Sequence, residues 1–441
     1  MDYSNIFVIL FISGSIINFS LDFFLNRVNY RHRLNHGLEI PPELQGLVEE
    51  DKLRKTVAYK NARYFLWIPK AILNVVLSLL LVLCGFYNWL YMLLWTWSGS
   101  LFVTVLLFVF ISSIPAALLN LPFDLYSEFK IEKDFGFSKM TPGMWIADEI
   151  KELIVSAMIG VPLIWAAVLL MTHLPSTWWL LLGLVYLAFV FLVSFIYPVL
   201  IAPMFNKFTP IEDGELKERL ISLLNKCGFH AKSLFVMDAS KRSGHSNAYF
   251  TGLGKNKRIV LYDTLIQQLS VEEITAVLAH ELGHYKHRHI IKKYCIMIPL
   301  IFLLLFALYL LTGLPSLYQG FGILPAGVDP SIPTDLKFFG IFLASLAFGD
   351  WIWIPSLISN AASRRDEFQA DAFSAQLCGS GEPLISALVK LNKENLSELT
   401  PPKIYCIFIY DHPPLLERIS AIRNTKEKGG RPIEGIPQSH E

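Results

Sequence analysis

Seven long apolar runs punctuate the 441 residues of this chain. Each approaches the roughly 20 residues that a helix needs to cross the hydrocarbon core of a bilayer. Hydrophobic residues make up 53% of the chain and charged residues only 17%, so the apolar excess must face lipid. The sequence therefore predicts a mostly α-helical protein with a bundle of seven membrane spans. The spans are expected at about Ile6–Phe24, Tyr64–Trp89, Leu101–Leu119, Leu153–Met171, Trp178–Ile201, Tyr294–Leu311 and Phe338–Ile358.

The placement of Lys and Arg predicts the orientation of this bundle. Basic residues gather in the first, third and fifth connections and past Ile358, whereas the second and fourth connections have none and the sixth has only Lys337. Because connections rich in Lys and Arg stay in the cytosol, we expect the N-terminus outside or in the lumen and the C-terminus inside. The formal net charge of +1 offers no basic excess for phosphates, so nucleic acid is not an expected partner.

The alternation of basic connections with connections poor in Lys and Arg divides the chain into four expected parts. Residues 1–200 hold spans one to five, and residues 201–293 form a cytosolic loop domain with a small β-sheet. Residues 294–358 hold spans six and seven, and residues 359–441 form a cytosolic C-terminal part. Asp350 lies deep in the last span, where a carboxylate is costly. It indicates either a polar interior between the helices or a pairing with a neighbouring hydroxyl group.

The fifth connection contains the motif His280-Glu281-Leu282-Gly283-His284. Ser270 and Glu273 form a capping box that predicts the start of a helix through this motif. Four residues apart on a helix, His280 and His284 project from one face and can share a metal ion. Glu281 is turned about 100° around the helix, from where it can act as general base on a metal-bound water. The pattern is typical of one catalytic zinc ion in a zincin-type metalloprotease domain.

No helix breaker separates the motif from the sixth span. We therefore expect the zinc helix to continue without interruption from His284 into Tyr294, which would keep the metal close to the membrane face. His287 and His289 fit a basic helix end near lipid headgroups better than they fit metal ligation.

A third metal ligand has to come from elsewhere in the chain. Glu367 and Asp371 lie four residues apart, just past the last span. Glu367 has the longer reach and is the expected third ligand, while Asp371 would hydrogen-bond the second nitrogen of a ligand histidine. The alternative is a charged helix surface on which Arg364 and Arg365 pair with these acids.

Two further residues are candidates for contact with the substrate. Asn247 opens a predicted strand that leads to a turn at Gly252, and an edge strand there could bind an extended peptide. His412 could stabilise the oxyanion that forms when water attacks the scissile carbonyl group. The alternative, for Asn247 and His412 each taken alone, is an ordinary turn residue that does not contact the substrate.

These motifs together resemble the type I CAAX prenyl proteases, the zinc endoproteases that remove the last three residues of prenylated proteins. The resemblance implies a chamber between the spans, zinc bound by His280, His284 and Glu367, and substrate contacts from Asn247 and His412. The catalytic residues would be Glu281 and His412. The motifs that carry the resemblance, in chain order, are Glu132–Phe137, Phe205–Pro210, Asn247–Phe250, His280–His284, Glu367–Phe373 and Asp411–Pro414.

The expected substrate is a lipidated or membrane-associated peptide or protein, and the bilayer is the other partner. A quality-control protease for membrane polypeptides would share the same catalytic residues, and a non-enzymatic scaffold or transporter would need a closed zinc site without a base. The sequence ends Gln438-Ser439-His440-Glu441, without the dilysine-type ending of some relatives. The expected location is therefore either the endoplasmic reticulum membrane or a bacterial inner membrane.

Overall fold

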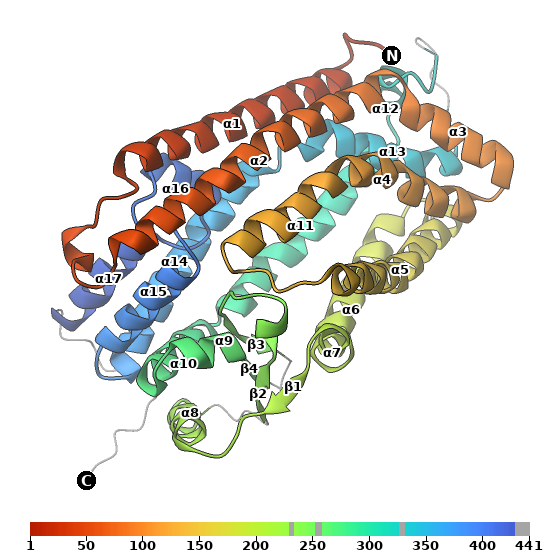
Figure 1. The fold of residues 1–441 in the computed structure, drawn as a ribbon. Helices are drawn as coiled ribbons and strands as arrows, with labels where there is room; N and C mark the ends of the chain where they lie inside the picture. The colour runs from red at the N-terminus through yellow and green to blue at the C-terminus, as the bar shows by residue number, and fades with distance from the viewer. Residues whose placement is uncertain (229–232, 252–257, 326–330, 428–441) are drawn as a thin grey trace.

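The computed structural model describes residues 1–228, 233–251, 258–325 and 331–427. Long helices run alongside one another, and a small sheet lies at the end of the bundle remote from the N-terminus (Figure 1). Six helices of this described part are long and apolar enough to cross a membrane, and one bent pair is a seventh candidate. The six are α1 (Ile6–His36), α2 (Glu50–Leu83), α4 with its π-helical end (Leu101–Glu132), α5 (Pro142–His173), α6 through α7 (Trp178–Phe205) and α11 (His289–Leu311).

The outer faces of these helices are apolar. In their most apolar windows of 18 residues, between 0% and 28% of the residues are buried inside the protein. Ile296 and Leu303 of α11, for example, are 71% and 62% exposed. An apolar surface of this extent is stable in lipid and not in water. The prediction of a multi-span helical bundle is confirmed.

The second span ends earlier than the sequence predicted. Tyr64–Trp89 was expected as one span, but α2 ends at Leu83 and Gly85 adopts a left-handed conformation with φ 74°. A separate helix, α3 (Phe86–Ser98), follows in a new direction. Glycine reaches this backbone region without steric cost, so the chain turns there.

The seventh expected span, Phe338–Ile358, is not one straight helix. The chain forms α13 (Thr334–Gly349) and α14 (Trp353–Leu377), which are bent by 67° at the break between them. Polar bonds fix the break to α1: the Ser15 hydroxyl donates to Asp350, and the Trp351 indole donates to the carbonyl of Leu10 at 3.1 Å. Asp350 also lines a cavity of about 250 Å³, so it has both a hydroxyl partner and a polar setting.

A four-stranded sheet and its helices form the end of the bundle. The strand order is β1 (Phe208–Pro210), β2 (Ser233–Met237), β4 (Arg258–Tyr262) and β3 (Ala248–Thr251), with β2 and β4 parallel and the other pairs antiparallel. The strand that follows Asn247 is thus an edge strand. The turn expected at Gly252 and the C-terminal residues from Gln438 lie outside the described residues.

Helix α10 (Val271–Lys286) carries the histidine motif. Its predicted capping box is present: the Ser270 side chain accepts from the Glu273 amide, and the Glu273 carboxylate accepts from the Ser270 amide. Residues of α8 (Glu215–Lys226), α9 (Asp263–Gln268) and β4 pack against its apolar side. The helix is therefore fixed at its start and along one face.

The expected continuation of this helix into the sixth span is wrong. Helix α10 ends at Lys286, Arg288 has a left-handed backbone with φ 55°, and α11 begins at His289. The turn directs His289 inward, where only 1% of it is exposed. Its expected place near lipid headgroups is therefore wrong as well. The buried contacts of His289 stabilise a backbone conformation that is unusual for arginine.

Helix α10 packs against the second half of α14. The Ser374 hydroxyl donates to the carbonyl of Ala276 at 2.7 Å, and Gly283 faces Ala370. A Cβ atom on Gly283 would lie 2.8 Å from the Cα of Ala370, a distance that real Cβ atoms essentially never show. The remaining helices are α12 (Pro315–Gly320), α15 (Glu382–Glu394), α16 (Lys403–Ile409) and α17 (Leu415–Glu427).

The first prediction concerns this close approach. Gly283→Ala should push α10 and α14 apart and destabilise the protein by about 1–3 kcal/mol, as overpacking in a core does. The matched control is Gly160→Ala in α5, whose Cβ would meet no atom within 4 Å. Thermal unfolding of both variants in detergent checks this, and equal melting temperatures would contradict it.

Candidate metal centre

Three side chains from two helices converge where α10 meets α14. The Nε2 atoms of His280 and His284 lie 3.2 Å apart. The Glu367 carboxylate of α14 faces both rings, at 3.5 Å from His280 Nε2 and 3.2 Å from His284 Nε2. One ligand atom of each residue lies within 4.8 Å of the others, a spacing suited to one metal ion.

The chemistry of this group fits a bound cation. Two imidazole nitrogens and one carboxylate oxygen are the protein ligands of many catalytic zinc sites. Glu367 is 4% exposed, and its Oε2 atom has no hydrogen-bond partner in the described part of the chain. A buried carboxylate oxygen without a partner is costly unless a positive charge compensates it. The residues therefore fit a metal ion.

Asp371 orients the ring of His280. Its Oδ1 atom lies 2.8 Å from His280 Nδ1, and both of its oxygens accept hydrogen bonds from Arg418, at 2.8 and 2.6 Å. Because Asp371 accepts at Nδ1, the lone pair of His280 lies on Nε2, the atom that faces Glu367. Arg418 is 9% exposed and pairs with this carboxylate through two parallel bonds.

A second chain of hydrogen bonds orients His284. The side-chain oxygen of Gln369 lies 3.1 Å from His289 Nε2, so this nitrogen carries the proton. His289 Nδ1 then accepts from His284 Nδ1 at 3.0 Å, which leaves the lone pair of His284 on Nε2. His289 thus does for His284 what Asp371 does for His280. Partners of this kind commonly tune the affinity of a metal site.

The electrostatics of the site act on His280 and on Glu281. Burial lowers the pKa of His280, but the hydrogen bonds to Asp371 and Glu367 outweigh burial and raise it to about 9. Burial raises the pKa of Glu281, against the opposing effect of the two histidines. A carboxylate with a raised pKa is a better proton acceptor, as a general base requires.

His412 comes to the site from the loop after α16. Its Nε2 atom lies 3.5 Å from Glu367 Oε1, and its Nδ1 atom lies 2.7 Å from Asp411. Arg364 of α14 fixes this loop because it donates to the carbonyls of Cys406 and Tyr410. The alternative in which Arg364 pairs with the acids of α14 is therefore wrong.

Asn247 lies on the sheet, next to edge strand β3. It is exposed at the start of edge strand β3, and its side-chain oxygen accepts from the amide of Ala248 at 2.8 Å. Its own carbonyl accepts from Tyr262 of β4. It marks the beginning of the strand edge.

Two residues of the site were missed in the sequence, namely Arg418 and the inward-facing His289. Arg418 had a detectable signal, because it shares a helical face with the buried residues Leu415, Ile419 and Ile422. A lone charge in an apolar stripe usually has a buried partner. His289 had none, since no glycine or proline marks the turn at Arg288.

Two family models match the chain in succession. Residues 29–207 match the N-terminal part of CAAX prenyl proteases, described as five membrane helices. Residues 210–426 match peptidase family M48, and this stretch contains every residue of the metal centre.

Similar proteins match over nearly the whole length of the chain. A CAAX prenyl protease 1 homolog of Arabidopsis thaliana is 36% identical over 88% of this chain and 91% of its own. The CAAX prenyl protease 1 of Saccharomyces cerevisiae is 35% identical over 97% of this chain and 98% of its own. The crystal structure of S. mikatae Ste24p is similar with a TM-score of 0.86 and 33% identity, over 94% of this chain and 99% of that one.

The second prediction separates the carboxylates of α14. Glu367→Ala should lower the bound metal strongly, since it removes one of three ligands. Asp366→Ala should change it little, because Asp366 lies 3.5 Å from His289 and outside the ligand group. Metal analysis of the two purified variants checks this. Loss of metal in Asp366→Ala, with metal retained in Glu367→Ala, would exclude the assigned ligand.

Proposed function

Since the chain belongs to the CAAX prenyl protease family within peptidase family M48, we propose that it hydrolyses a peptide bond near the C-terminus of prenylated proteins. One observation carries the proposal: the group His280, His284 and Glu367 lies beside the carboxylate of Glu281 in a membrane-spanning chain. A protein or peptide is the substrate of such a metallopeptidase. That this substrate carries a lipid is the second part of the proposal.

The proposed metal is one zinc ion per chain, held by His280, His284 and Glu367. When bound, zinc supplies Lewis-acid chemistry: it polarises a carbonyl group and lowers the pKa of water. Asp371 and His289 keep the two imidazole rings turned so that both Nε2 lone pairs point to the ion. In this proposal, residues 201–293 and the part from residue 359 act as the catalytic unit, and the spans hold the substrate.

The remaining residues have separate roles in the hydrolysis. Glu281 takes a proton from the attacking water and later passes it to the leaving amine. His412, with Nδ1 bonded to Asp411, donates a hydrogen bond from Nε2 in its imidazolium form to the oxyanion that develops on the scissile carbonyl group. Asn247 and the free edge of β3 hold the peptide in an extended conformation. The exposure of His412 and of Asn247 supports both contacts with the substrate.

The position of the site supports a lipid-bearing substrate. The spanning helix α11 begins only three residues after the last residue of α10, so the metal ligands lie close to the membrane surface. A peptide anchored by a prenyl chain is concentrated at this surface, and each buried CH₂ of the chain contributes about 0.8 kcal/mol. The lipid therefore raises the affinity for the substrate.

The third prediction tests the base. Glu281→Gln should keep its metal, because the three ligands are unchanged, and should lose about 10²–10⁴-fold of its activity. Metal content and cleavage of a farnesylated CAAX peptide are measured on the same preparation. Near-normal turnover with metal bound would exclude Glu281 as the general base.

The fourth prediction tests the lipid. The value of kcat/KM should be higher for a farnesylated CAAX peptide than for the unlipidated peptide of the same sequence, in detergent and in liposomes. Glu281→Gln is the control for contaminating proteases. Equal values in both media would favour the alternative role, in which the enzyme removes membrane polypeptides irrespective of a lipid.

The fifth prediction concerns orientation. The distribution of basic residues places the metal centre in the cytosol and the connection between α12 and α13 on the other side. Single cysteines at Ser331 and Ser439, in a background without the native five, should be labelled differently by an impermeant thiol reagent on intact bacteria. Labelling of Ser331 alone is expected. Labelling of Ser439 from outside would reverse the orientation.

A further inference from the structure

A cavity of about 530 Å³ lies between α1, α2, α4 and the segment from Glu398 to Tyr410. Basic side chains outnumber acidic ones in its wall. Its acids are Asp124 and Glu398, and its basic residues are Arg33, Lys60, Arg63 and Lys70. The cavity is therefore a candidate site for an anion.

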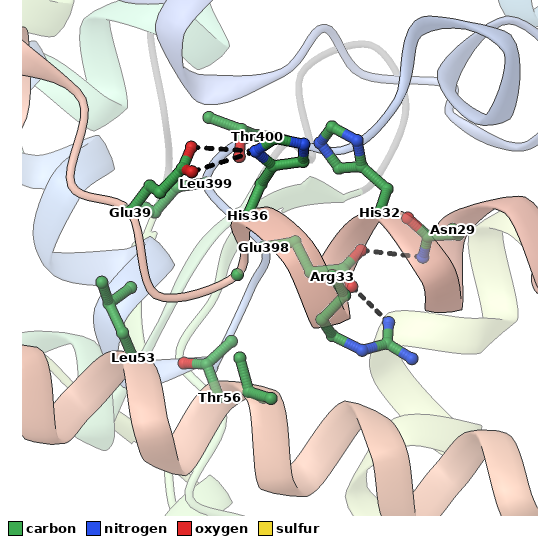
Figure 2. Close-up of a pocket in the computed structure, with 12 residues that line it drawn as sticks. Asn29, His32, Arg33, His36, Glu39, Leu53, Thr56, Glu398, Leu399 and Thr400 are labelled. Atoms are coloured by element: carbon green, nitrogen blue, oxygen red, sulfur yellow. Dashed lines mark hydrogen bonds and ion pairs between the residues drawn. The ribbon is translucent and has the colours of Figure 1, made fainter.

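Two of the four basic residues already have acidic partners. Arg33 forms an ion pair with Glu398. Figure 2, which draws a neighbouring pocket that shares these residues, shows Arg33 and Asn29 both directed at this carboxylate. Lys70 lies 2.6 Å from Asp124. These two pairs use both acids of the wall, so neither pair attracts a further anion strongly.

Lys60 and Arg63 retain positive charge toward the cavity. Lys60 forms no ion pair with any residue in the described ranges, and its ammonium group lies 5.5 Å from the centre of the Tyr59 ring. Arg63 donates to the Tyr59 hydroxyl at 2.9 Å and forms an ion pair with Glu132 at 3.7 Å, so its charge is partly compensated. A half-buried ammonium group without a counter-ion favours an anionic ligand.

Asn29 is bound to one of the two acids of the wall. It is 6% exposed, and its side-chain nitrogen donates to Glu398 at 2.9 Å, which fixes the orientation of the amide. Its oxygen atom is buried and is not accessible to a ligand in the cavity. The cavity therefore attracts a ligand mainly by positive charge, through Lys60.

The cavity lies close to the catalytic residues along the chain. Tyr410 is part of its wall, and His412 follows two residues later beside Glu367. Arg364 donates to the Tyr410 carbonyl, so α14 positions both the metal ligand and this wall. Three extended residues of a substrate reach about 10 Å beyond the scissile bond. Two residues span at most about 7 Å of chain, so the side of the cavity at Tyr410 is within reach of a peptide bound beside His412.

We propose that this cavity binds the C-terminal carboxylate of the peptide substrate through Lys60, with Arg63 adding positive charge beside it. This assignment rests on the function proposed above. A carboxylate bound in the cavity fixes the number of substrate residues between the scissile bond and the C-terminus of the peptide. The site would therefore select cleavage three residues from that C-terminus.

The test compares two farnesylated CAAX peptides that differ only in a free C-terminal carboxylate or a C-terminal amide. Wild type should prefer the free acid. Lys60→Gln should lower kcat/KM for the acid about tenfold or more, mainly through KM, and leave the amide unchanged. Lys60→Arg should keep the preference. The matched control is Lys55→Gln, an exposed lysine of the same helix, which should behave as wild type.

Fluorescence anisotropy measures the binding of the same peptides to Glu281→Gln, so the affinity of the site is determined without hydrolysis. Tighter binding of the acid, lost in the Glu281→Gln, Lys60→Gln double variant, supports the site even if turnover is slow. An equal loss for acid and amide would reduce Lys60 to a structural role and overturn the proposal. Equal binding of both peptides by Glu281→Gln, together with a phospholipid retained by wild type and lost in Lys60→Gln, would overturn it in favour of a lipid phosphate. Failure of wild type to cut either peptide counts against the proposed function instead.

Discussion

The contact of Gly283 with Ala370 sets the geometry on which the rest of the site depends. One helix brings two imidazoles and the other brings a carboxylate, and their ligand atoms meet only because the backbones approach closely at this point. Core packing of α10 against the sheet and its capping box fix one partner. The bend at Asp350 and its bonds to α1 fix the direction of the other. The membrane bundle thus determines where Glu367 lies.

Around this contact, hydrogen bonds determine the state of each ligand before a metal binds. The Asp371 carboxylate accepts a hydrogen bond from His280 Nδ1, and Arg418 compensates its buried negative charge. His289, which is oriented by Gln369, accepts the corresponding hydrogen bond from His284. The inward turn at Arg288 is therefore part of the chemistry of the site. It also explains why the metal helix does not continue into the membrane.

Much of this architecture could be predicted from local patterns. Hydropathy located the spans because lipid requires long uninterrupted apolar helices, and helical spacing placed His280 and His284 on one face. The break at Arg288 could not be predicted, since it contains no glycine or proline. The break at Asp350 has a local signal, because Gly349 precedes it and Pro355 follows it, but the bend of 67° does not follow from that signal alone. Each is stabilised by distant partners, Gln369 in one case and Ser15 in the other. Arg418 had a signal in its apolar helical face, but its carboxylate partners could not be predicted, because they lie on another helix.

The central claim is that two histidines of α10 and one carboxylate of α14 hold a single zinc ion. X-ray absorption at the zinc edge, on protein purified without added metal, tests it most directly. We expect one equivalent of zinc with only nitrogen and oxygen neighbours at about 2.0–2.2 Å, and outer-shell scattering from two imidazoles. A sulfur neighbour at about 2.3 Å, or a signal that four imidazoles are needed to fit, would contradict the site described for this chain.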